Sequence, residues 1–188
     1  MSSEKGAGNV GRRMGSSPDI GAVFDEHVAA EFVDLDLDAT MATMTDDPYV
    51  NHVPAMTGGV GREAVRSFYG QHFIGKWPAD IEITPVSRTV GEAQVVDELV
   101  LSFTHDIEMP QLLPGVAPTG RHVRLAFCVV VGFEDGRVHH EHIYWDQASL
   151  LVQVGLLDPA ELPVTGAEQA ENVLDPRARP LNELIRRA

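Results

Sequence analysis

Residues 136–155 read GRVHHEHIYWDQASLLVQVG, and this stretch decides how the rest of the chain is interpreted. Its first half has the two-residue period of a strand, and its second half is apolar. The Asp135–Gly136 pair directly before it is a strong signal for a tight hairpin turn. The stretch therefore predicts the last strand of an antiparallel sheet.

Three segments upstream have the same strand period, and two earlier segments have helical spacing. The strand-like segments are 80–90, 93–108 and 121–134. The helix-like segments are 20–44, with Asp19 as N-cap and a break at residues 34–38, and 61–73. A short strand is expected over 46–54. Helices that precede an antiparallel sheet predict an α+β fold.

The domain organisation follows from where these patterns start and stop. Residues 1–18 are expected to form a flexible tail, 19–157 one domain, and 158–188 an extension packed on that domain or on a dimer partner. The strand LAFCVVVGF (residues 125–133) is apolar on both faces, so its second face needs a cover. A homodimer through the sheet is the prediction, and a cover by the C-terminal extension is the alternative.

Charge and composition exclude several classes of partner. The net charge of −14 argues against binding to nucleic acid or to anionic membrane surfaces. No apolar run approaches the ~20 residues of a membrane helix, and the first residues lack the apolar centre of a signal peptide. A cytoplasmic protein is the expectation.

The strand at 137–147 offers two sets of side chains, one for each face. The first set would provide two imidazoles, a phenol and a carboxylate if the helices covered its face, and such a set is equipped for general acid/base chemistry. The members of this first set are His140, His142, Tyr144 and Asp146. The second set consists of His139, Glu141, Ile143 and Trp145.

A metal site is the alternative for the same strand. His140 and His142 would present two ligands to one ion, with Asp146 or His52 as the third. No third ligand has a diagnostic spacing, and the helical His-Glu-x-x-His signature is absent. We therefore predict neither a metal nor another cofactor.

Four residues elsewhere are further candidates for the pocket. His52 and its neighbour Asn51 lie on the short strand before Pro54. Glu98 interrupts an apolar strand and would be either a second pocket carboxylate or, as we favour, the partner of Arg88 or Arg124. His105, at the end of that strand, would lie at the cavity mouth.

Taken together, DDPYVNHVP (46–54), GREAVRSFYGQHF (61–73), PTGRHV (118–123) and residues 134–155 resemble the SnoaL-like polyketide cyclases and ester cyclases. These belong to the nuclear transport factor 2-like, or ketosteroid isomerase-like, superfamily. The resemblance implies a cone-shaped α+β barrel with a deep pocket, and usually a dimer. In the cyclases an Asp at the end of the last strand is the general acid/base of a metal-free aldol closure. Asp146 matches that position, and His52 matches a common pocket residue.

The leading hypothesis is a cofactor-independent enzyme acting on a small, hydrophobic, oxygenated molecule, of the cyclase, isomerase or hydrolase/lyase type. Asp146 would be the acid/base and His142 would relay its proton. His52 and Tyr144 would orient a substrate oxygen, and His140, Glu98, His105 and Asn51 would complete the substrate site. The alternatives are a binding module without catalysis on the same fold, and a metal-dependent lyase or hydrolase that uses His140 and His142.

Overall fold

The computed structural model describes residues 18–187, so the predicted tail lies, apart from Pro18, outside the described residues. The helical elements are α1 (Ile20–Phe32), α2 (Leu37–Ala42), α3 (Arg62–Phe68), the π-helical turn η1 (Tyr69–Phe73), α4 (Gln147–Gln153), α5 (Glu168–Leu174) and α6 (Glu183–Arg187). The strands are β1 (Met44–His52), β2 (Thr57–Val60), β3 (Glu82–Val90), β4 (Gln94–Thr104), β5 (His122–Glu134) and β6 (Arg137–Trp145).

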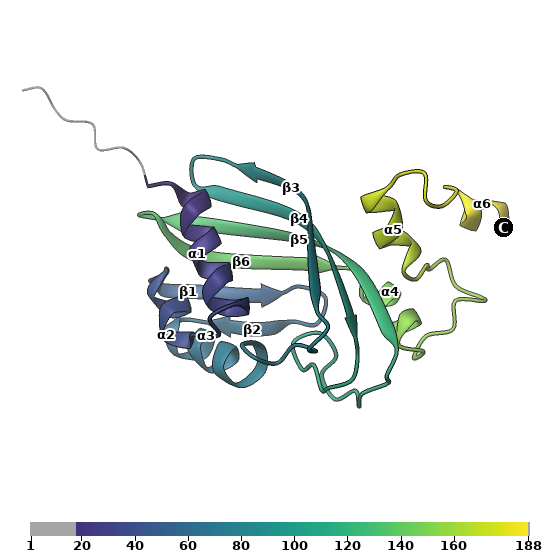
Figure 1. The fold of residues 1–188 in the computed structure, drawn as a ribbon, viewed down its shortest axis with the longest axis horizontal. Helices are drawn as coiled ribbons and strands as arrows, with labels where there is room; N and C mark the ends of the chain where they lie inside the picture. Colours follow the sequence, from purple (N-terminus) through teal and green to yellow (C-terminus); the bar gives the residue numbers. More distant parts are fainter. Residues whose placement is uncertain (1–17, 188) are drawn as a thin grey trace, which may run out of the picture.

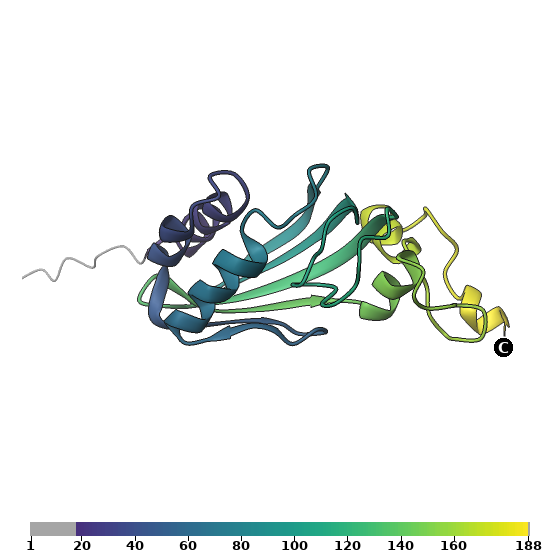
Figure 2. The ribbon, with the colours of Figure 1, turned by 90° about the horizontal axis from the view of Figure 1, so that it is seen from below.

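One curved sheet with helices on its concave side forms the fold (Figures 1 and 2). The strand order is β2-β1-β6-β5-β4-β3. All neighbours pair antiparallel except β1 and β6, which run parallel. Helix α1 contacts β4 and β6, whereas α3 contacts β1 and β2. The predicted α+β class with a curved sheet is confirmed, and the sheet is open rather than closed into a barrel.

The helix boundaries follow local capping rules. The Asp19 side chain accepts a hydrogen bond from the Ala22 amide at 3.2 Å, which confirms it as the N-cap of α1. The predicted break is present: Leu35 has a positive φ of 52° between α1 and α2. The second helical segment divides into α3 and η1, in which the Ile74 amide donates to the Tyr69 carbonyl oxygen at 2.8 Å.

The hairpin between β5 and β6 sets which residues face the helices. Asp135 and Gly136 both have positive φ, of 50° and 75°, as the tightest hairpin turns require. Alternation along β6 then puts Glu141, Ile143 and Trp145 on the concave face, where all three are buried. Three of the four members of the second set therefore face the helices, and the first set does not; the fourth, His139, is half-buried where the pairing of β5 and β6 shifts register.

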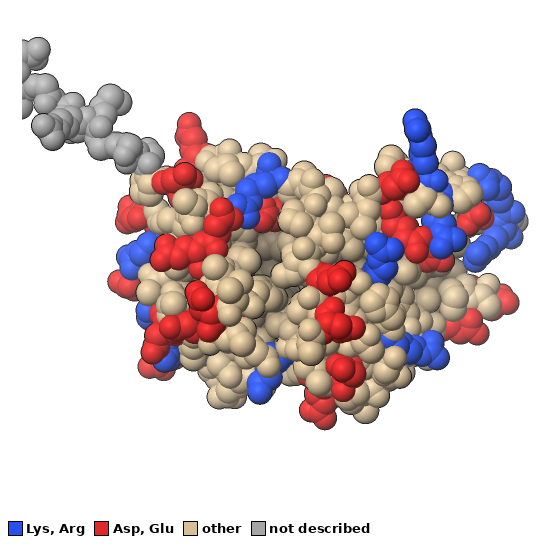
Figure 3. Space-filling view, in the orientation of Figure 1, with Lys and Arg blue, Asp and Glu red and all other residues tan. Residues whose placement is uncertain are grey.

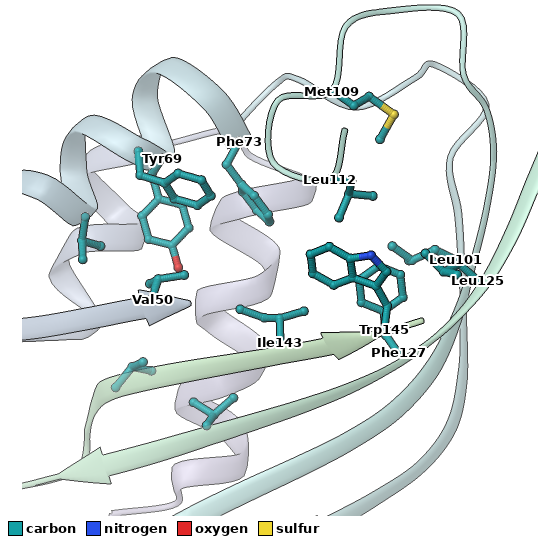
Figure 4. Close-up of a cluster of buried hydrophobic side chains, with 14 of the residues drawn as sticks. Val50, Tyr69, Phe73, Leu101, Met109, Leu112, Leu125, Phe127, Ile143 and Trp145 are labelled. Atoms are coloured by element: carbon teal, nitrogen blue, oxygen red, sulfur yellow. The ribbon is translucent and has the colours of Figure 1, made fainter. Parts of the chain in front are cut away.

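The connection between β4 and β5 closes one end of the core. Its residues Met109 and Leu112 are fully buried and lie beyond Trp145 (Figure 4). Beyond β6, Ser149 donates a hydrogen bond to the Gly166 carbonyl oxygen at 2.7 Å, and α5 contacts β5.

Cys128 on the outer face of β5 stays exposed, and the homodimer stays a prediction. Within residues 18–187, every helix is too short or too polar to cross a membrane.

Candidate functional site

A cavity of about 580 Å³ lies between α1, η1 and the concave face of the sheet. Figure 3 shows a hollow between the surface over α1 and the surface over β3, with acidic side chains on both sides. The walls are mostly aliphatic and aromatic, as in pockets for small apolar molecules. Four polar residues line the cavity and are themselves buried: Glu31, His52, Tyr69 and Glu141.

The buried polar group is centred on His27, which is fully buried in α1. Glu31 lies one helical turn further along α1, and its Oε1 is 3.2 Å from His27 Nε2. Glu141 reaches the same nitrogen from β6, with its Oε1 at 2.8 Å. The Tyr69 hydroxyl lies 3.3 Å from Nε2. We call His27, Glu31, Tyr69 and Glu141 the inner cluster.

Hydrogen bonding on the far side of the ring fixes the tautomer of His27. The Thr43 hydroxyl donates its hydrogen to the Thr40 carbonyl oxygen at 2.7 Å, so toward His27 it can only accept. It lies 2.6 Å from His27 Nδ1, which must therefore carry a hydrogen. Nε2 is left to face the two carboxylates, and it has a hydrogen to direct toward them only when it is protonated as well.

The groups of the inner cluster shift the pKa values of one another. Burial alone lowers the pKa of His27, but the nearby Glu31 and Glu141 carboxylates outweigh burial and raise that pKa to about 10. Burial raises the pKa of Glu31, although the imidazolium opposes it. Burial also raises the pKa of the Tyr69 hydroxyl, and both carboxylates add to this effect. The cluster therefore combines an imidazole that favours its protonated form, a phenol that keeps its hydrogen and a carboxyl group whose pKa lies above its ordinary range.

His52 lines the same cavity and has a different environment. Its ring lies among aromatic side chains, with centroids 5.4 Å from Trp145 and 5.7 Å from both Phe68 and Phe73. Burial lowers the pKa of His52 to about 4, only partly offset by the charge of Glu141. Its buried Nδ1 has no hydrogen-bond partner within the described chain. A neutral imidazole in this position is free to bond to a ligand.

An ion-pair group lies at the exposed end of the cavity. The Arg88 guanidinium donates to both oxygens of Asp97, at 2.6 and 2.7 Å, and to Asp25 of α1 at 2.6 Å. It also lies over the Phe24 ring, 5.4 Å from the centroid. These contacts join α1 to the sheet beside the cavity opening.

The inner cluster also has the composition of a metal site. One ligand atom each from His27, Glu31 and Glu141 lies within 4.8 Å of the others, and residues 18–187 contain no other such group of three. The predicted alternative with His140 and His142 as ligands therefore lacks a third ligand in the described chain. The donor set of the inner cluster suits a divalent transition metal.

Asp146, the predicted general acid/base, lies outside the cavity. It is the N-cap of α4, where its Oδ1 accepts from the Ser149 amide at 3.1 Å. Its Oδ2 accepts from the Gln169 side chain at 2.6 Å, which ties α5 to the end of β6. The expectation that this carboxylate enters the pocket is wrong, since the side chain is exposed and structural.

Four more predicted residues lie on the outer face of the sheet. Tyr144 is 43% exposed there, so the expectation that it enters the cavity is wrong. His142 pairs with Asn51 across β1 and β6, and neither lines the cavity. His140 also faces outward: its ring stacks on Tyr49 with centroids 5.0 Å apart. The strand alternates as expected, but its other face meets the helices.

Of the last two candidates, Glu98 lies at the cavity and His105 does not. Glu98 lies at the cavity rim, where it is exposed and accepts a hydrogen bond from Ser87 at 3.1 Å. Its two expected partners are paired elsewhere: Arg88 with Asp97 and Asp25, and Arg124 with Glu171 at 3.9 Å. His105 is fully buried outside the cavity lining, with Nδ1 3.1 Å from the Thr119 hydroxyl. It holds the β4–β5 connection rather than the cavity mouth.

The structure brings together residues that the sequence reasoning did not select. His27 lies in the helix-like segment 20–44, and Glu141 lies in the second set of the strand at 137–147, opposite to Asp146. Two signals were available. A histidine within an apolar stripe, with an acidic residue one turn later, is unusual, and Glu141 shares its strand face with Ile143 and Trp145.

Comparison with known protein families identifies the family of this domain. The family model for the SnoaL-like domain matches residues 24–141. The chain belongs to the SnoaL-like domain family. The matched part of this SnoaL-like chain includes the whole inner cluster and His52 but ends before Asp146.

Solved structures with the same fold are distant in sequence. AclR from Streptomyces galilaeus, a candidate hydroxylase, is 22% identical, with a TM-score of 0.57 over 76% of this chain and 89% of that chain. A candidate SnoaL-like polyketide cyclase from Jannaschia sp. CCS1 is 17% identical, with a TM-score of 0.58 over 79% and 100%. SalBIII, an epoxide hydrolase/cyclase-like enzyme, is 15% identical, with a TM-score of 0.51 over 68% and 90%. No curated protein matches this SnoaL-like chain.

Proposed function

We propose that the chain is an enzyme that uses the inner cluster for general acid/base chemistry on a small, mostly apolar, oxygenated molecule. The observation that carries this proposal is the convergence of the Glu31 and Glu141 carboxylates on one imidazole nitrogen at the cavity wall. Titratable groups whose pKa values are shifted by burial and by each other are typical of catalytic pockets. Membership in the SnoaL-like domain family, and the likeness of the fold to an epoxide hydrolase/cyclase-like enzyme, support a reaction of the cyclase or hydrolase type.

The roles follow from the positions and the burial of the polar groups. Glu141, held by the His27 imidazolium, is the carboxylate that removes a proton from carbon beside a substrate carbonyl group. Glu31, whose pKa burial raises and whose carboxylate lies within 4.8 Å of that of Glu141, takes up this proton and returns it to the product. The developing enolate oxygen accepts hydrogen bonds from neutral His52 and from the Tyr69 hydroxyl, both buried and both on the cavity wall.

The test is exchange of carbon-bound hydrogen, which does not require the natural substrate. Bicyclic ketones such as 1-tetralone are incubated with the protein in D2O, and deuterium beside the carbonyl group is measured by mass spectrometry. We expect wild-type protein to accelerate exchange, and Glu141→Gln to reduce that acceleration about 100-fold or more. Asp146→Asn is the matched control, because asparagine also caps a helix, and it should retain the wild-type rate within about twofold.

Two outcomes would contradict the proposal. Loss of exchange in Asp146→Asn with retention in Glu141→Gln would return the acid/base role to Asp146. An absence of acceleration by wild-type protein over the whole ketone panel, with the ketones shown to bind, would favour the binding module without catalysis.

A further inference from the structure

The charged side chains that line the cavity are strongly unbalanced. Among residues 18–187, the lining contains one guanidinium, that of Arg88, and no lysine. It contains five carboxyl groups, from Asp25, Glu31, Asp97, Glu98 and Glu141. A cavity with low-dielectric walls and an excess of one charge concentrates ligands of the opposite charge.

Arg88 does not correct this imbalance, because its charge is already shared. Asp97 binds two of its nitrogens and Asp25 binds the third. Asp97 is only 13% exposed, so this pair is fixed in the wall. The two carboxylates around one guanidinium leave the exposed end of the cavity acidic, and Glu98 adds to it.

The inner end of the cavity also has fewer positive than negative charges. Glu31 and Glu141 share a single imidazolium, whose one Nε2 hydrogen cannot point at both oxygens at 3.2 and 2.8 Å. The Oε1 atoms of both residues are buried without a well-directed hydrogen bond from the described chain. Both side chains line the cavity, so a cation in the cavity can approach the carboxylate that the imidazolium leaves unpaired.

The remaining walls suit an organic cation better than a bare ion. Most of the lining between the two acidic ends is aromatic or aliphatic, and ring faces attract cations that carry alkyl groups. The aromatic residues of the lining are Phe24, Phe32, Tyr69, Phe73, Trp77 and Phe127. We infer that the ligand of this cavity carries one positive charge, as a protonated or quaternary amine, on an apolar body.

The inference rests on the proposed function in placing the ligand in the same cavity, but it requires no turnover. Its test uses two molecules of nearly equal shape that differ in charge: 4-(trimethylammonio)phenol and 4-tert-butylphenol. Binding of each to the full chain is measured by isothermal titration calorimetry at pH 7 and low salt. We expect the cation to bind at least tenfold more tightly than the neutral molecule.

Variants locate the source of that preference. Glu141→Gln and Glu31→Gln, made separately, should each reduce the ratio of the two affinities at least fivefold, while Asp146→Asn should leave it unchanged. Circular dichroism confirms that each variant is folded, and two separate glutamate variants keep the test decisive if one of them unfolds. Equal or tighter binding of the neutral molecule would overturn the inference, as would an unchanged ratio in both glutamate variants.

Zinc distinguishes the organic cation from a metal ion. After treatment with a chelator, the wild-type protein should bind the ammonium probe without added metal. Stoichiometric binding of Zn²⁺ that is tighter than either probe, and that Glu141→Gln abolishes, would assign the missing positive charge to a metal and overturn the inference. Cation preference together with no ketone exchange would contradict the proposed function alone, and ketone exchange without cation preference would contradict this inference alone.

Discussion

His27 Nε2 lies 2.8 Å from Glu141 Oε1, so the first helix and the last strand of the domain meet through an ion pair inside the core. The imidazole is fully buried and Glu141 nearly so. A buried pair of this kind is costly to break, because either partner alone is left as an uncompensated charge. Stability and the proposed chemistry therefore depend on the same contact.

Replacement of His27 by glutamine should destabilise the fold strongly. The variant leaves Glu31 and Glu141 facing each other without a cation, and breaking a buried pair this way costs about 3 to 5 kcal/mol. Urea unfolding followed by circular dichroism measures the loss. Glu141→Gln, which removes one charge and keeps an acceptor, should lose less. An H27Q protein within about 1 kcal/mol of wild type would show that the ion pair contributes little.

The same pair predicts a decline in stability at alkaline pH. The pKa of His27 is about 10 in the folded chain and near its ordinary 6.5 in the unfolded chain. The contribution of His27 is therefore complete below pH 6.5 and is lost as pH rises toward 10, by up to ~1.4 kcal/mol per pH unit. Unfolding free energies at pH 6, 8 and 9.5 test this. A flat profile over that range would contradict the buried imidazolium.

His52 predicts a decline in stability at acidic pH. Its pKa of about 4 in the folded chain lies below its ordinary value, so its contribution is complete above pH 6.5 and is lost as pH falls toward 4. Nitrogen-15 spectra of the imidazoles should show His52 neutral at pH 5.5. A protonated His52 at that pH would argue against its role as a neutral donor.

Asp146 should behave as a helix cap rather than as a catalytic group. Asp146→Ala removes the acceptor for the Ser149 amide and the contact with Gln169, and we expect a loss of about 1 kcal/mol. Hydrogen exchange should then increase in α4 and α5. Asp146→Asn should restore the cap. Equal exchange in the alanine variant and wild type would show that Asp146 does not hold the extension.

Much of the fold could be predicted from the sequence because its signals are local. The Asp19 cap, the break before α2 and the Asp135–Gly136 turn each depend on a few neighbouring residues. The two-residue period of β6 was also correct. Period alone does not say which face meets the helices. The expectation that Tyr144 and Asp146 face them is wrong. The apolar Ile143 and Trp145 mark the buried face.

The site was harder to predict because its members are far apart in the chain. Glu31 is one turn from His27, but Glu141 and Tyr69 come from other elements. Nothing in the sequence shows that one imidazole nitrogen contacts all three. His52 could be selected because it lies on a short strand typical of the family, and the structure places it on the cavity wall.

Helix α1 supplies two members of the inner cluster from consecutive turns, and this limits how the gene can change. A substitution on the outer side of α1 leaves the cluster intact. An inserted or deleted codon between the Asp19 cap and His27 would rotate the following residues by about 100°, which would turn His27 and Glu31 away from Glu141. We expect homologous genes with the same chemistry to vary by point mutation on the outer side of α1 but to keep its length.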